Sequence, residues 1–551
     1  MRAIWIVVAF FVALAPTLVW QEFSSSPENL VVATSMEMRR GGPWLVPTLQ
    51  GEPRIAKPPL AAWITAAAIR PQTMRDIDTL DHDIRENGFK WLAIETRWPA
   101  LVSACLLLLG VFELGCAIGD AQLGFNATAI AATTYFLLRF SRYTTTDIQL
   151  ALWVTWANVF LANAIIRRRY WSGFIGAGLM LGLAMMSKGP VGLIESVVPC
   201  AVFLGVRRKS ATTWLSLPKS EATPPVWRAL IVGFLLFLAS GLWWYAIVLA
   251  RNSDVVHRWF SEVTRIDATE SAPGPIFTYL GIIGYVVPWT VFLFVGVIVI
   301  ARQLKARQIM PDLLSLLLLA VPLIVMSFAK DRQDRYALPM IPAAAIVAAI
   351  GVREYLTRPR FATFIASLHW LMLAGIAIVV PLLGTTPLLK QSTGEPWFSP
   401  RFGALEATLG GGLVLAGIML HWRRSGALVV MTVVTMLVMQ AVIFKGYCSS
   451  NSGQSDFKRF ADLIAARYPD ATFFNAHPKS KRPPTDLGVY LNRTIRLTTD
   501  PQSLHATEHP IVLFMLQNKG EPEPAPPDGW HFVDVTHRDK DLWWAFVLPP
   551  S

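Results

Sequence analysis

The segment FAKDRQDRYALPMIP concentrates three basic side chains within six residues. Lys330, Arg332 and Arg335 precede Tyr336, and two aspartates only partly offset their charge. Lysine and arginine in such numbers are typical of phosphate-binding sites, because charged donors form short, strong hydrogen bonds to phosphate oxygens. An ordinary solvated surface loop is the alternative that this pattern also permits.

Further basic residues stand where proline or glycine constrains the backbone. Lys57 directly precedes two prolines, which keep it out of a helix. Lys188 lies in MMSKGPVGL, between two apolar runs and before a Gly-Pro turn. A lysine so near hydrocarbon usually faces a polar cavity or the interface, although ordinary snorkelling explains Lys57 equally well. Arg54 and Arg265 complete the predicted phosphate-binding set.

Two carboxylates are candidates for moving a proton. Glu28 lies early in a long polar segment, and Asp147 follows SRYTTT at the start of an apolar run. A carboxylate can accept the proton of an attacking hydroxyl, so we predict that these two residues are catalytic. Helix capping by Thr146 or Asp147 is an equally good explanation of the aspartate from sequence alone.

Long apolar runs separate these residues, and each run can cross about 30 Å of hydrocarbon. Hydrophobic residues make up 53% of the 551 residues and charged residues 16%, whereas soluble proteins carry roughly 25% charge. An apolar soluble enzyme is excluded, because so many runs exceed the length of a buried core helix. We predict about thirteen membrane helices, near residues 3–20, 98–118, 124–140, 148–166, 172–187, 190–206, 229–250, 277–301, 312–328, 337–352, 363–384, 404–421 and 427–445.

The loops between the runs indicate the direction of crossing. If the N-terminus is cytoplasmic, the loops after the even-numbered helices are cytoplasmic and basic, as the positive-inside rule requires. These loops are at 167–169, 207–209, 302–307, 353–360 and 423–424. An odd number of helices then places the C-terminus outside. The membrane topology accounts for the net charge of +12, so we expect no nucleic-acid partner.

Two segments are too polar to cross the membrane. The loop 21–97 has one short apolar stretch, 58–70, which we expect to lie at the interface. From residue 446 the sequence FKRFADLIAARY predicts an amphipathic helix, and DATFFNA, DLGVYL, PIVLFML and WWAFVLP predict strands. We therefore predict an all-α membrane domain, residues 1–445, and a small α/β domain, residues 446–551.

The motifs also occur in an order that resembles a known family. They run WLVPTLQGEPRIAKPPLAAW, YTTTDIQLAL, LAMMSKGPVGL and RQDRYALPMIPAAAI, with LGVYLNR in the last domain. The series resembles the polyprenyl-phosphate-dependent glycosyltransferases of the GT-C fold. Within them it is most similar to the lipid A aminoarabinose transferases and the dolichyl-phosphate-mannose mannosyltransferase-like proteins. The resemblance covers nearly the whole chain, although no single motif in it is decisive.

The resemblance implies a multi-pass, monomeric enzyme of the bacterial inner membrane with a periplasmic C-terminal domain. Its donor would be a sugar on undecaprenyl phosphate or a similar lipid, and its acceptor a lipid A-like or other envelope glycan. By the same resemblance Asp147 belongs to the catalytic region, and the basic residues hold the donor phosphate. We expect no cofactor, and the sequence leaves a need for a divalent cation open.

The chain departs from the family pattern at three places. The usual Asp-Glu of the first loop reads Pro27-Glu28, so Glu28 is the nearest carboxylate. The residue before the first-loop lysine, usually acidic, is Ala56. A usual Glu-His pair reads Glu262-Val263, so we predict no metal there. A polyprenyl-lipid transporter and a non-catalytic lipid-binding relative remain alternatives, although a transporter would need charges deep within its helices.

Overall fold

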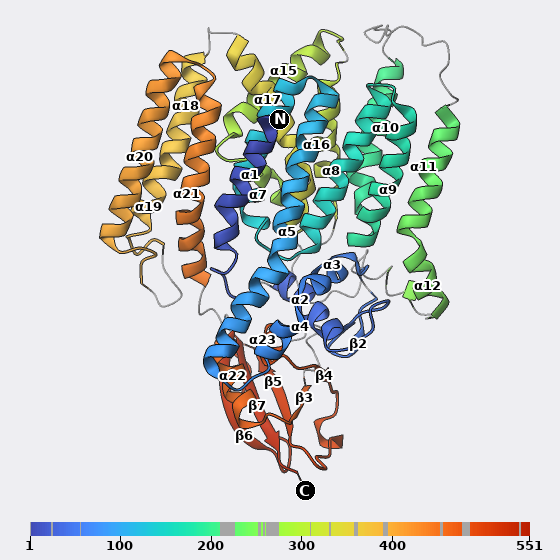
Figure 1. The fold of residues 1–551 in the computed structure, drawn as a ribbon, viewed down its shortest axis with the longest axis vertical. Coiled ribbons are helices and arrows are strands. Elements are labelled where there is room, and N and C mark those ends of the chain that lie inside the picture. The colour runs from blue at the N-terminus through green and yellow to red at the C-terminus, as the bar shows by residue number, and fades with distance from the viewer. Residues whose placement is uncertain are drawn as a thin grey trace.

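A bundle of long helices carries a five-stranded sheet at one end (Figure 1). The mostly helical architecture follows from the apolar runs, because a helix satisfies all of its backbone hydrogen bonds internally in hydrocarbon. The computed structural model describes residues 2–23, 26–55, 57–209, 226–251, 255–256, 259, 275–308, 310–329, 332–357, 362–389, 395–451, 456–476, 485–518, 520–538 and 541–550.

The predicted apolar runs coincide with helices. Most form a single helix: α1 (Arg2–Leu14), α5 (His82–Ile118), α8 (Thr146–Ile165), α9 (Tyr170–Lys188), α10 (Val191–Lys209), α16 (Asp312–Ser327), α17 (Ile341–Thr357), α20 (Pro400–Arg423) and α21 (Ala427–Asn451). Others are divided: α6 (Ala121–Ala132) and α7 (Tyr135–Phe140), α11 (Val226–Gly241) and α12 (Trp243–Arg251), α14 (Ile282–Tyr285) and α15 (Thr290–Lys305), and α18 (Ala362–Ala374) and α19 (Val380–Leu383).

Helix length and composition alone give fewer membrane crossings than the number of apolar runs predicts. Within the described chain, seven helices are long and apolar enough to cross, or nine if each of two bent pairs is one span. The pair α11 and α12 bends by 45°, and the pair ending in α15 by 112°. Helix α16 has 16 residues, which cover only about 24 Å. The total of thirteen therefore stays a prediction.

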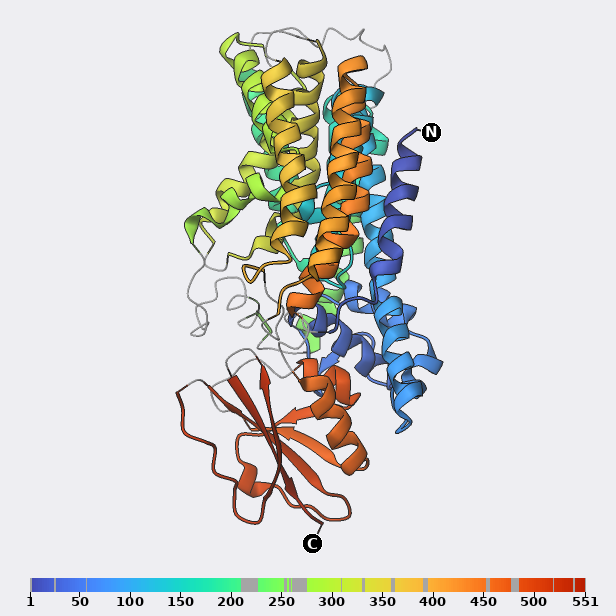
Figure 2. The same cartoon turned by 90° about the vertical axis from the view of Figure 1, so that its left-hand side faces the viewer.

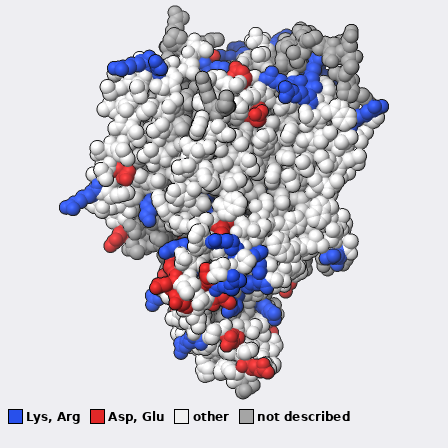
Figure 3. Space-filling model, viewed as in Figure 1, with Lys and Arg blue, Asp and Glu red and all other residues white. Residues whose placement is uncertain are grey.

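Charged side chains are concentrated at the ends of the bundle. Figure 3 shows lysine and arginine along the rim opposite the sheet, with a largely uncharged belt beneath them. At this rim Arg167 donates to carbonyl oxygens of the α5 C-terminus, including Ala117 at 3.0 Å. Arg353 pairs there with Asp312 at 2.8 Å. This distribution agrees with the positive-inside pattern of the sequence.

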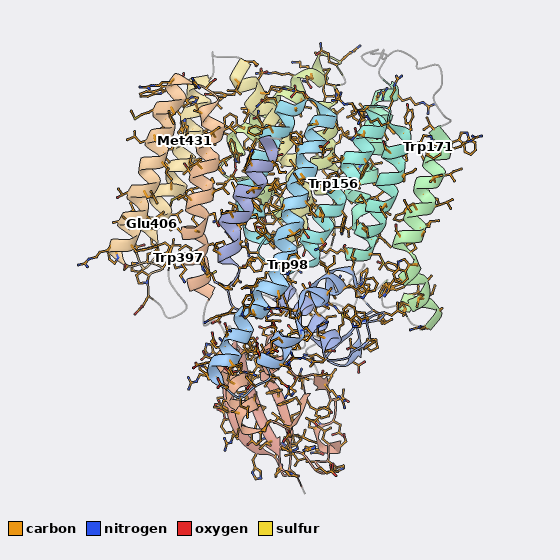
Figure 4. The ribbon with its side chains drawn as sticks, in the orientation of Figure 1. Trp98, Trp156, Trp171, Trp397, Glu406 and Met431 are labelled. Atoms are coloured by element: carbon orange, nitrogen blue, oxygen red, sulfur yellow. The ribbon has the colours of Figure 1, made fainter. Side chains whose placement is uncertain are left out.

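Exposed tryptophans stand near both edges of the uncharged belt. Figure 4 shows Trp98 and Trp397 toward the sheet end of the bundle and Trp171 toward the opposite rim. Trp98 and Trp171 are 44% and 40% exposed. Tryptophan at two such levels is typical of the two membrane–water interfaces.

The loop 21–97 forms a layer between the bundle and the sheet (Figure 2). It contains α2 (Ser26–Arg39), β1 (Thr48–Leu49), β2 (Glu52–Pro53), α3 (Leu60–Ala68) and α4 (Pro71–Asp76). Helix α3 has only nine residues, as expected of a stretch too short to cross the membrane. Helix α5 has 37 residues, about 56 Å, and so extends from the bundle through this layer.

The C-terminal segment forms a mixed sheet with two helices. Its strands are β3 (Thr472–Asn475), β4 (Ile495–Leu497), β5 (Ile511–Gln517), β6 (His531–Arg538) and β7 (Asp541–Leu548), in the order β4-β3-β5-β7-β6. Strand β3 pairs in parallel with β4 and β5, and the other pairs are antiparallel. The helices are α22 (Phe457–Arg467) and α23 (Thr485–Leu491).

The predicted strand at DLGVYL is wrong, because these residues form α23. A short apolar run does not distinguish a buried helix from a strand, and here tertiary packing decides. Leu487, Val489 and Tyr490 are all buried where α23 packs against α22 and α2. Strands β4 and β6 were not predicted, because β4 has only three residues and most residues of β6 are polar.

The membrane-side layer and the sheet share one hydrophobic core. Phe23 and Val32 of the first loop belong to the same buried cluster as Phe460 and Phe514 of the C-terminal segment. An ion pair also joins the two parts, since Arg85 of α5 pairs with Asp462 of α22 at 2.8 Å. The predicted boundary at residue 446 falls within α21, and the segment that follows this helix shares a core with the first loop.

Candidate functional site

Asp147 is the centre of a buried charge cluster at the end of the bundle that faces the first-loop layer. It lies in the first turn of α8, and its side chain is 3% exposed. Its Oδ1 accepts a hydrogen bond from Nζ of Lys188, the last residue of α9. Its Oδ2 lies 3.5 Å from Nε of Arg335, in the 3-10 segment Asp334–Met340. Three segments that are distant in sequence thus converge on one carboxylate.

The ring of Tyr336 forms cation–π contacts with both cations of this cluster. Nζ of Lys188 lies 3.8 Å from the ring centroid, and the guanidinium carbon of Arg335 lies 5.4 Å from it. An aromatic face attracts cations without neutralising them, so Tyr336 can orient both groups while leaving their charge available. The sequence predicted these three residues as one binding set, and the structure brings them together.

Arg54 and Lys57 line a small pocket beside this cluster. Thr146, the residue before Asp147, forms part of the pocket wall. The charge of Lys57 also acts on Lys188, which places the two ammonium groups within electrostatic reach of each other. The first loop and the ends of α8 and α9 therefore enclose one basic region.

The cationic stretch of the first loop is fixed against α2. Nη1 of Arg54 donates to the carbonyl oxygen of Leu30 at 2.6 Å and to Oγ1 of Thr34 at 2.7 Å. The following Pro58 and Pro59 line the same pocket immediately before α3 begins. The contacts of Arg54 hold its guanidinium at this pocket.

Glu28 forms a buried ion pair with Arg97 of α5. Its Oε1 and Oε2 accept from Nε and Nη2 of Arg97 at 2.8 and 3.0 Å, and the two side chains are 0% and 1% exposed. Arg97 also donates through Nη1 to the carbonyl oxygens of Leu18 and Gln21. Both charges are thereby paired and hydrogen-bonded, as a buried ion pair requires.

The same carboxylate fixes the connection that leads to Asp147. The backbone N–H of Thr144 donates to Oε1 of Glu28 at 3.2 Å, and Oγ1 of Thr144 donates to the carbonyl oxygen of Thr96 at 2.7 Å. Both oxygens of Glu28 are therefore occupied. This geometry favours a positioning role for Glu28, and its predicted catalytic role stays a prediction.

The remaining predicted residues lie elsewhere or outside the described chain. Arg332 donates through Nη1 to the carbonyl oxygens of Ser327 and Ala329 at 3.3 and 2.7 Å, and so satisfies the end of α16. Lys330 and Arg265 lie outside the described residues, as does the segment at 262–263 where we predicted no metal.

Sequence reasoning missed Arg97 and Glu195. Glu195 lies in α10, is 2% exposed, and has no hydrogen-bond partner for either carboxylate oxygen among the described residues. Lys188 and Asp147 lie within electrostatic range of this carboxyl group. The sequence did contain a signal for Glu195, because this glutamate lies inside the apolar run VGLIESVVP. An ionisable residue within a membrane helix is costly and usually functional.

Together these residues suit a particular kind of chemistry. Lys188 and Arg335 contact one buried carboxylate, and Arg54 and Lys57 line a pocket that reaches the neighbouring Thr146. Such a region can bind an anionic group and accept a nearby proton. The cations would also stabilise negative charge that develops on a departing phosphate.

Known proteins resemble this chain in sequence. Residues 89–247 match the family described as dolichyl-phosphate-mannose-protein mannosyltransferase. An undecaprenyl phosphate-alpha-4-amino-4-deoxy-L-arabinose arabinosyl transferase of Sodalis glossinidius (strain morsitans) is 28% identical over 415 residues, covering 72% of this chain and 65% of that protein. A transferase of the same description from Proteus mirabilis (strain HI4320) is 26% identical over 364 residues, covering 64% and 58%. The chain thus spans less than two thirds of the length of these relatives.

The fold itself matches over the whole chain. The crystal structure of ArnT from Cupriavidus metallidurans bound to undecaprenyl phosphate superposes with a TM-score of 0.73 and 17% identity. The match covers 98% of this chain and 97% of that chain. The predicted resemblance to GT-C polyprenyl-phosphate glycosyltransferases is therefore confirmed.

Proposed function

We propose that this protein is a membrane glycosyltransferase that takes its sugar from a polyprenyl-phosphate donor. The acceptor would be a lipid A-like molecule or another envelope glycan, and transfer would take place on the periplasmic face. The convergence of Lys188 and Arg335 on Asp147, beside the pocket of Lys57, is the observation that carries this proposal. The likeness to arabinosyl transferases supports the donor class.

In this reaction the donor phosphate binds among the basic residues. Lys57 and Arg54 meet it from the pocket wall, while Lys188 and Arg335 approach from the side of Asp147. Arg335 is the more exposed of the two partners of Asp147, with 25% of its side chain accessible against 11% for Lys188. We therefore expect Arg335 to exchange its contact with Asp147 for the incoming phosphate.

Asp147 then accepts the proton of the acceptor oxygen as that oxygen attacks the anomeric carbon. The new bond joins acceptor oxygen and sugar, and the bond between sugar and phosphate breaks, so polyprenyl phosphate departs with an added negative charge. The basic residues stabilise this charge, and one such contact contributes ~3 kcal/mol to transition-state stabilisation. Attack opposite the leaving group inverts the anomeric configuration. No nucleotide is consumed, because the glycosyl phosphate is already activated.

The orientation that we propose puts the N-terminus in the cytoplasm and the sheet in the periplasm. The basic rim opposite the sheet supports it (Figure 3), since lysine and arginine are retained on the cytoplasmic side. The protein would act in the bacterial inner membrane as a monomer, without a resident cofactor.

Reconstitution in proteoliposomes tests the activity directly. With undecaprenyl phosphate carrying radiolabelled 4-amino-4-deoxy-arabinose and lipid A as acceptor, we expect label in the acceptor and release of undecaprenyl phosphate. Mass spectrometry of envelope glycolipids, with and without the protein, then identifies the natural acceptor. A transporter would move the labelled donor across the bilayer without breaking the sugar–phosphate bond, and a non-catalytic relative would only bind it. Either of these results excludes a transferase.

A further inference from the structure

A second pocket lies between α7 and α21. It is formed by α7, by Arg142 and by one face of α21. It has no lining residue in common with the pocket of Lys57.

Arg142 is the polar group at the centre of this second pocket. Its side chain is 3% exposed, and its Nε and Nη2 have no hydrogen-bond partner among the described residues. Its guanidinium packs 4.0 Å from the ring centroid of Phe444, which supplies an attractive face but no counter-charge. By contrast, the neighbouring Arg139 pairs with Asp334 at 3.6 Å.

A buried guanidinium without a carboxylate is costly, because its charge has lost water and gained no counter-ion. Burial lowers the pKa of Arg142 to about 9, and the nearby Cys448 and Tyr143 only partly oppose this shift. The group is still protonated at neutral pH. An anion that entered the pocket would restore the missing partner with two charge-assisted hydrogen bonds.

The other lining residues are mostly apolar, with one polar amide, which suits a ligand that has both a polar head and an apolar chain. Met436, Gln440, Ile443 and Phe444 recur at helical spacing and form one stripe of α21, which is among the helices able to cross the membrane. The Nε2 of Gln440 donates to the carbonyl oxygen of Ala13 at 3.0 Å, and its Oε1 has no partner among the described residues. This oxygen can accept from a hydroxyl beside the anion, while the apolar residues contact acyl chain.

We propose that this pocket binds the anionic head group of a membrane lipid, with Arg142 as its counter-ion and Gln440 as an acceptor for a neighbouring hydroxyl. The site is separate from the donor site and does not depend on sugar transfer. Bulk anionic phospholipid and a phosphate-bearing lipid substrate share this chemistry, and competition experiments distinguish them.

Lipid binding to the purified full-length protein in a neutral detergent tests the proposal. Native mass spectrometry with phosphatidylglycerol and phosphatidylcholine of matched chains is expected to show at least tenfold tighter binding of phosphatidylglycerol. Arg142→Gln should remove this preference, whereas Arg401→Gln, at an exposed site in the first turn of α20, should keep it. Because Arg142 has no carboxylate partner among the described residues, Arg142→Gln should melt at the wild-type temperature or above it.

Gln440→Glu provides a second variant that leaves Arg142 in place. The new carboxylate enters the pocket of Arg142 and should abolish the preference for phosphatidylglycerol. A competing lipid identifies the source of the head group. Lipid A displacing phosphatidylglycerol would indicate a phosphate-bearing substrate, and failure to displace it would indicate bulk phospholipid. Undiminished selectivity in Arg142→Gln would overturn the proposal.

Discussion

Replacement of Asp147 by asparagine is expected to lower the rate of sugar transfer by about 100-fold or more, because the amide cannot accept the acceptor proton. The same change should leave the affinity for undecaprenyl phosphate intact or raise it. In the resting state the carboxylate neutralises Lys188 and Arg335, so its loss leaves both cations available for phosphate. Initial rates and equilibrium binding, measured on the same preparation, give the two quantities.

Asp312→Asn is a matched control for this experiment. Asp312 is also a buried aspartate paired with an arginine, Arg353 at 2.8 Å, but it lies at the opposite rim of the bundle. We expect it to affect stability without affecting the transfer rate of the folded protein. An Asp147→Asn protein that transfers sugar at the wild-type rate would remove Asp147 from the chemistry.

Loss of either partner of the Glu28–Arg97 pair is expected to be the most destabilising single change in the first-loop layer. Glu28→Gln or Arg97→Met leaves an uncompensated buried charge, which costs about 3–5 kcal/mol. The melting temperature in detergent should fall by several degrees, as measured by intrinsic tryptophan fluorescence. The double variant Glu28→Leu/Arg97→Met removes both charges and should recover much of this loss.

The double variant also separates a positioning role of Glu28 from a catalytic one. If Glu28 only holds Arg97 and the N–H of Thr144, the folded double variant should keep measurable transfer at a reduced rate. If Glu28 accepts a proton in the reaction, a well-folded double variant should be inactive. The ratio of its transfer rate to its folded fraction is the deciding quantity.

The membrane architecture could be predicted because hydrocarbon imposes strict rules on sequence. Apolar length and the position of basic loops located the helical runs, and the same topology assigned Lys57, Asp147, Lys188 and Arg335 to one end of the bundle. Helix ends that lie at one membrane face can meet even when they are distant in sequence. The sequence therefore predicted that Asp147 lies at the same end of the bundle as Lys188 and Arg335, although it did not predict their direct contacts.

Specific pairing between distant residues could not be predicted. Glu28 and Arg97 are 69 residues apart, and no periodicity in the sequence marks them as partners. Helix α23 resembles a strand in sequence. Its seven residues are too few to distinguish the helical repeat of apolar residues from the alternating repeat of a strand. The first loop and the sheet are far apart in the sequence, so their shared core could not be predicted either. In this core Phe23 contacts Tyr490.

The dissociation constant of undecaprenyl phosphate for wild-type protein and for Lys57→Gln tests the central claim most directly, with undecaprenol as the uncharged control. If the basic region holds the phosphate, the wild type should bind the phosphate far more tightly than the alcohol. Loss of one charged contact should weaken binding about tenfold or more. Equal affinities for the phosphate and the alcohol, or an unchanged constant in Lys57→Gln, would contradict this assignment of the donor site.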